Sequence, residues 1–78
     1  MSLFERLQPT IANALKVPAA QVTPTMRDED LPAWDSLGQV NLIISLEQTF
    51  GVYVEVEDFE KLKSVPAILD YLATQNVA

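Results

Sequence analysis

The chain of 78 residues has room for one small domain, which we expect to span residues 1–78. It contains no cysteine and no histidine, which excludes thiol nucleophiles, disulfides and every catalytic pair that relies on an imidazole. The formal net charge of −6 argues against nucleic acid and anionic membrane surfaces as partners, because both are bound through clustered lysines and arginines. The composition therefore argues against most enzymatic chemistry. It is compatible with a basic protein as the partner.

The amino-terminal segment predicts neither export nor membrane insertion. It carries Glu5 early and lacks the long apolar core of a signal peptide. The longest strongly apolar cluster, residues 42–44, is far too short to cross a bilayer. We therefore expect a soluble protein of the cytoplasm that does not insert into membranes.

The first predicted helix covers residues 2–16. Ser2 and Glu5 have the spacing of a capping box, in which each side chain bonds a backbone N–H group at the helix start. Apolar residues then recur at steps of three and four and place one stripe towards a core: Phe4, Leu7, Ile11 and Leu15. Pro9 lies within this run and removes a backbone hydrogen bond, so we expect either a kink or a late start of the helix.

Residues 17–35 are predicted to form a long connection, because Pro18, Pro24 and Pro32 exclude a long helix. A connection of this length in a small domain needs apolar anchors or a function of its own. The candidate anchors are Val17, Val22, Met26, Leu31 and Trp34. The two alanines that follow Pro18 favour a single helical turn there.

The strongest helical pattern covers residues 36–50. Asp35 is a good N-cap, and Gly51 can end the helix because glycine adopts left-handed backbone angles without strain. Apolar residues recur here at steps of three and four, and two neighbours widen the face: Leu37, Val40, Ile43, Leu46 and Phe50, with Leu42 and Ile44.

The rest of the chain predicts one short helix and one longer helix. Residues 52–54 predict a short extended stretch rather than a strand, since no second strand is available to pair with it. A short helix is expected at 56–62, and a longer one at 65–74 with Ser64 as its cap and Pro66 in its first turn. The predicted fold class is therefore all-α, a small four-helix bundle of three long helices and one short helix.

The acidic residues do not have the spacing of a metal site. Asp28 would be the first residue of a calcium loop whose sixth and twelfth positions need glycine and glutamate, but the chain has Ala33 and Gln39 there. The acids within residues 55–60 lack ligand spacing too, and they suit the first turn and solvent face of a short helix. We therefore predict no metal site.

Ser36 is the candidate for covalent chemistry. It stands at the start of the strongest helix, behind a proline-rich connection that should leave its hydroxyl exposed. A serine at this place can simply cap the helix. Alternatively, the backbone N–H groups and the dipole of a helix N-terminus favour a phosphate esterified to the hydroxyl. Spacing alone leaves both interpretations open.

The tripeptide Asp35-Ser36-Leu37 resembles the signature of acyl carrier proteins and of the related carrier domains of polyketide and nonribosomal peptide assembly. The resemblance covers essentially the whole chain in its length, its acidic charge, its long first connection and the start of its second helix. Further matches are Leu46-Glu47, Phe50-Gly51, Ser64-Val65 and Tyr71.

The resemblance implies a carrier that is not itself an enzyme. A separate, magnesium-dependent phosphopantetheinyl transferase would attach 4′-phosphopantetheine from coenzyme A to Ser36, and Asp35 would help it to place its metal and the serine. The arm ends in a thiol, on which an acyl group travels as a thioester. The implied partners are this transferase, an acyl-loading ligase or transferase, and downstream synthases, with the carrier acting as a monomer.

In this family the second helix is the recognition surface, which implies partner contacts through Leu37, Val40, Ile44 and Glu47. Val40 and Ile44 could equally belong to the core. A second set is expected in the core or in the lining of an acyl cleft: Leu46, Phe50, Phe59, Leu62 and Ile68.

The second helix departs from that of fatty-acid carriers, because Glu47 is its only acid between residues 36 and 50. Electrostatic steering at this helix should therefore be weak. This departure, together with Trp34, favours a fatty-acid-like or specialised polyketide or lipid pathway over housekeeping fatty-acid synthesis. Two alternatives remain open: an aminoacyl or peptidyl carrier, including the D-alanyl type, and an unmodified helical protein-interaction module.

Overall fold

The structure, a computed structural model, describes residues 2–75. Within these residues the frame consists of three α-helices, α1 (Leu3–Leu15), α2 (Ser36–Phe50) and α3 (Val65–Thr74). The same part of the chain forms three short 3₁₀ helices, η1 (Ala19–Gln21), η2 (Asp28–Asp30) and η3 (Val56–Lys61), and it contains no strand. With η3 as the short fourth helix, the predicted all-α bundle is confirmed.

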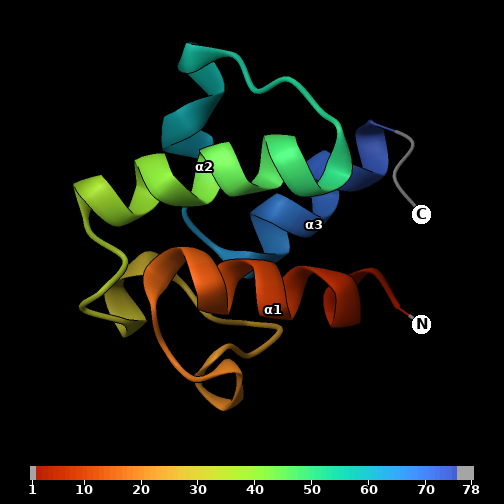
Figure 1. The fold of residues 1–78 in the computed structure, drawn as a ribbon. Coiled ribbons are helices and arrows are strands. Elements are labelled where there is room, and N and C mark those ends of the chain that lie inside the picture. Colours follow the sequence, from red (N-terminus) through yellow and green to blue (C-terminus); the bar gives the residue numbers. More distant parts are fainter. Residues whose placement is uncertain (1, 76–78) are drawn as a thin grey trace.

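Figure 1 shows how the helices are arranged around the core. α1 and α2 pack side by side and run in opposite directions, while α3 crosses behind α2. η3 lies over the first half of α2. The connection between α1 and α2 is paired with the segment before α3, since Asp28 N donates to Lys63 O (2.9 Å) and Val65 N donates to Met26 O (2.8 Å). These contacts bring the long connection and η3 together near the start of α2.

The core draws on all three α-helices and on the long connection. Its largest fully buried side chains are Leu7, Ile11, Val22, Leu42, Ile43, Leu46, Val65, Ile68 and Leu72. Four of the predicted anchors of the connection are buried and the fifth, Val17, is partly buried against the core. The connection is therefore held by its apolar residues, as the sequence predicts.

α1 begins at Leu3 because its first turn has a complete capping box. The Ser2 hydroxyl accepts a hydrogen bond from Glu5 N (3.1 Å), and the Glu5 carboxylate accepts one from Ser2 N (2.7 Å). The hydrogen bond with the Ser2 backbone lowers the pKa of the exposed Glu5 carboxyl most, and the hydrogen bond with the Ser2 side chain lowers it further. The helix begins at Leu3 and continues through Pro9, so of the two expected effects of this proline, a kink or a late start, the late start is wrong. The capping box and the buried apolar stripe offset the one backbone bond that proline removes.

α2 begins and ends where the sequence predicts, with Asp35 as its N-cap and Gly51 at φ 67° as its C-cap. Its buried face carries Gln39, Leu42, Ile43 and Leu46. Its outer face carries Leu37, Val40 and Ile44, which are 70%, 43% and 46% exposed. The alternative that Val40 and Ile44 belong to the core is therefore wrong. The helix is apolar on two sides, and residue spacing could not show which side would be covered.

Candidate functional site

Ser36 is the first residue of α2, and it is exposed. The helix is capped by its neighbour, because the Asp35 carboxylate accepts a hydrogen bond from Gly38 N (2.8 Å). The serine hydroxyl is therefore not the N-cap. It stands at the positive end of a 15-residue helix, where the dipole and the backbone N–H groups would stabilise a phosphate ester.

Gly38 allows the chain before Ser36 to pass close to α2. A Cβ atom at this position would collide with the Ala33 carbonyl oxygen and would lie 3.0 Å from Leu15 Cδ2. The Ala33 backbone can therefore approach α2 this closely only because glycine has no side chain. This close approach sets the course of the chain into Asp35 and Ser36.

We expect Gly38→Ala to lower the free energy of unfolding by about 1–2 kcal/mol, although alanine is the better helix former. The collision with a backbone carbonyl should outweigh the gain of about 1 kcal/mol in helix propensity. Urea denaturation measures the change, with Asn41→Ala as the control because Asn41 is exposed on the same helix. Stabilisation of both variants would show that the connection moves aside without cost.

The side chain of Gln39 joins three segments next to Ser36. Its oxygen accepts a hydrogen bond from Trp34 Nε1 (2.6 Å), and its nitrogen donates to Phe59 O (2.7 Å) and Leu62 O (3.0 Å). Gln39 is 6% exposed and Trp34 is 4% exposed. We call the Gln39 carboxamide and its three partners, Trp34 Nε1, Phe59 O and Leu62 O, the Gln39 clamp. The sequence alone did not reveal this cluster, and its one signal was a polar residue in register with the buried face of α2.

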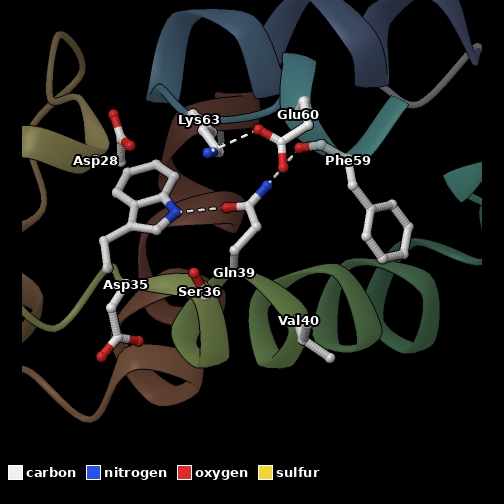
Figure 2. A pocket seen from close by; sticks show the side chains of 9 residues that line it. Asp28, Asp35, Ser36, Gln39, Val40, Phe59, Glu60 and Lys63 are labelled. Atoms are coloured by element: carbon white, nitrogen blue, oxygen red, sulfur yellow. Dashed lines mark hydrogen bonds and ion pairs between the residues drawn. The ribbon is translucent and has the colours of Figure 1, made fainter. Parts of the chain in front are cut away.

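A pocket of about 400 Å³ opens beside Ser36. Figure 2 shows the Gln39 carboxamide reaching across it from α2 towards η3, with Lys63 and Glu60 on the opposite side from Ser36. Lys63 Nζ lies 2.8 Å from Glu60 Oε2. The hydrogen bond and the charge of Glu60 raise the pKa of the Lys63 ammonium, and Asp28 adds a smaller effect of the same sign. The pocket therefore combines amide, carboxylate and ammonium groups with the apolar side chains of Val40 and Phe59.

The residues predicted for the core or an acyl cleft are divided between the interior and the surface. Leu46, Leu62 and Ile68 are buried in the core. Phe50 is partly buried, with the Arg6 guanidinium 5.1 Å from its ring centroid. Phe59 is the member of this set that borders the pocket beside Ser36.

The predicted recognition residues lie on the outer face of α2, with one exception. Glu47 is half-buried and accepts a hydrogen bond from Val54 N (2.9 Å), so its carboxylate holds the following loop to the helix. Tyr53 and Val56 on that loop are 72% and 77% exposed. The sequence alone indicated no role for them, since an alternation along residues 52–56 would turn Tyr53 outwards but Val56 to the same side as the buried Val54.

The acidic cluster of the long connection serves local structure. Residues 28–30 form η2, in which Asp30 Oδ2 accepts a hydrogen bond from Arg27 N (2.9 Å). Among residues 2–75, no group of three or more acidic side chains is placed to hold a metal ion. No helix in that same range is long and apolar enough to span a membrane.

Known proteins resemble this chain over all or most of its length. A family model described as "Phosphopantetheine attachment site" matches residues 5–72. Acyl carrier proteins of Helicobacter pylori strains G27 and J99 are 44% and 42% identical over 79 aligned residues, which cover the whole of both chains. An acyl carrier protein of Thermosynechococcus vestitus is 41% identical over 71 residues, 90% of this chain and 86% of the relative. The matched region runs from α1 to α3 and includes Ser36.

Proposed function

Because the chain belongs to the acyl carrier proteins, a family of non-catalytic carriers with phosphopantetheine, we propose that Ser36 is its attachment residue. The observation that carries this proposal is the exposed hydroxyl at the first position of α2, where Asp35 has taken over the capping. When attached, the arm supplies a thiol that this cysteine-free chain lacks, and an acyl group travels on it as a thioester.

The residues around Ser36 fit a phosphodiester. The first turn of α2 presents the positive end of the helix dipole to the negative charge, while Gly38 N is engaged by the Asp35 carboxylate. Asp35 is exposed beside the serine, and we propose that it helps a phosphopantetheinyl transferase to place its metal ion and the hydroxyl. The hydrogen bond that the Asp35 carboxylate accepts from Gly38 N holds the first turn of α2 in one conformation.

The experiment that tests the proposal is intact mass spectrometry. The purified protein is incubated with coenzyme A, magnesium and a promiscuous phosphopantetheinyl transferase. A gain of one phosphopantetheine supports the proposal. No gain, from a folded protein shown to be unmodified at the start, would contradict it and would favour the unmodified interaction module.

We propose that partner enzymes bind the outer face of α2. Its apolar side chains, Leu37, Val40 and Ile44, are exposed and adjoin Ser36 along the helix. The one acid of α2, Glu47, is engaged with Val54 N. Partners that load or process the acyl group should therefore recognise this face through apolar contact rather than through charge.

Salt should accordingly have little effect on recognition. We expect the KM of the transferase for the wild-type carrier to change less than about threefold between low and moderate salt, because exposed charges are screened and apolar contacts are not. Gln48→Glu adds an exposed acid to α2 and serves as the comparison, since salt acts on the transferase equally in both assays. A KM for the wild type that rises with salt as steeply as the KM for Gln48→Glu would contradict the prediction.

The neutral surface of α2 also supports a specialised polyketide or lipid pathway, or a fatty-acid-like one. The polar pocket beside Ser36 keeps the aminoacyl or peptidyl carrier, including the D-alanyl type, as the second candidate. Formation of an aminoacyl thioester by a cognate ligase, without fatty acyl loading, would favour that candidate. Our proposal treats residues 1–78 as one monomeric carrier domain of the cytoplasm, which gel filtration and cell fractionation test.

A further inference from the structure

The pocket beside Ser36 differs in polarity from the core behind it. Asp28, Glu60 and Lys63 border it, and the last two form an ion pair of 2.8 Å. The Gln39 carboxamide lies between these charges and Ser36 (Figure 2). A group that enters the pocket from the serine therefore meets ionic and amide atoms before it reaches the core.

Gln39 stands between this pocket and the core. Its oxygen and nitrogen are engaged by Trp34 Nε1 and by the carbonyls of Phe59 and Leu62. One turn further along α2, Leu42 and Ile43 are 0% and 1% exposed. The glutamine side chain thus reaches across the pocket from α2 towards η3 (Figure 2), and its hydrogen bonds hold it there.

An alkyl chain could pass Gln39 only by breaking the clamp. Trp34 Nε1 and Leu62 O would then lose the Gln39 amide as their partner, which costs more than moving an apolar side chain aside. A short acyl group can stay in the outer pocket instead. There the Lys63 ammonium can donate a hydrogen bond, and the carboxylates of Asp28 and Glu60 can accept one.

We infer that Gln39 determines cargo specificity by keeping the acyl group in the pocket beside Ser36. Gln39 excludes long alkyl chains from the core, and the charged groups of Lys63, Asp28 and Glu60 favour short acyl groups with hydrogen-bonding substituents. This inference rests on the proposed attachment at Ser36.

The test compares melting temperatures of acyl forms that differ in chain length. The transferase loads acetyl-, hexanoyl- or octanoyl-phosphopantetheine from the corresponding coenzyme A thioester, and intact mass verifies each product. In the wild type the three Tm values should agree within about 2 °C. A chain buried in the core would raise Tm by about 10 °C or more from acetyl to octanoyl, and such a rise would overturn the inference. Failure of loading would instead overturn the proposed function.

Gln39→Ala removes the barrier, and Gln48→Ala is the matched control because Gln48 is exposed on the same helix. We expect Tm to rise with chain length in Gln39→Ala and to stay constant in Gln48→Ala. A constant Tm in Gln39→Ala would overturn the assignment to this residue. If Gln39→Ala does not fold, the wild-type series still decides whether long chains are excluded.

The preference for polar cargo has its own readout. The 3-hydroxybutyryl form of the wild type should melt above the butyryl form, and Lys63→Met should reduce the difference. Equal melting temperatures of the two wild-type forms would overturn the polar preference.

Discussion

Replacement of Ser36 by alanine should abolish the attachment of phosphopantetheine, while the free energy of unfolding changes by less than about 1 kcal/mol. The hydroxyl is the attachment atom in our proposal, whereas the capping of α2 is done by the Asp35 carboxylate on Gly38 N. Intact mass after incubation with coenzyme A, magnesium and the transferase measures the first effect. Urea denaturation measures the second.

Thr49→Ala is the matched control, since Thr49 is also an exposed hydroxyl residue of α2. It should gain one phosphopantetheine, as the wild type does. A mass gain in Ser36→Ala would place the attachment elsewhere and refute the proposal. A loss of stability well beyond about 1 kcal/mol would restore the purely structural interpretation of the serine.

Gln39→Leu should lower the free energy of unfolding by about 3 kcal/mol or more. Leucine fills a similar space but leaves Trp34 Nε1 and Leu62 O without their amide partner, whereas Phe59 O keeps its hydrogen bond from Leu62 N (3.2 Å). Each buried polar group left unpaired costs about 1–3 kcal/mol. In a domain of this size, that is a large part of the total stability. Urea denaturation followed by circular dichroism gives the value.

Gln48→Leu is the comparison, and its effect should stay within about 0.5 kcal/mol because the side chain is exposed. Trp34 is the only tryptophan of the chain, so its fluorescence reports on the clamp directly. We expect the emission of folded Gln39→Leu to differ from that of the wild type and of Gln48→Leu. If Gln39→Leu lowers the free energy of unfolding by less than about 1 kcal/mol and leaves the tryptophan emission unchanged, the hydrogen bonds of the clamp are not needed for stability.

The ends of the helices could be predicted because capping is local. Ser2, Asp35 and Ser64 each cap the predicted helix by accepting a hydrogen bond from the backbone N–H group three residues later. Gly51 ends α2 with a left-handed backbone for an equally local reason. The position of the candidate serine at the start of α2 followed from these signals, and the family resemblance supplied its chemistry.

The covered side of α2 could not be predicted in the same way. Apolar residues occupy two sides of this helix, and the covered side includes a glutamine. Gln39 is buried because its amide meets Trp34, Phe59 and Leu62, which lie 5, 20 and 23 residues away in the sequence. The spacing of apolar residues shows which side chains share a helix face. It contains no information about hydrogen-bond partners this far away in the sequence.

The sequence by itself therefore determined the helices, their caps and the exposed place of Ser36, since each depends on residues within one or two turns. Only the tertiary structure decided that Val40 and Ile44 face outwards and that a polar pocket adjoins the serine. The physical reason is that both features arise from packing η3 and the long connection against α2. Those contacts join residues far apart in the chain, and they depend on burial and hydrogen-bond satisfaction rather than on local preference.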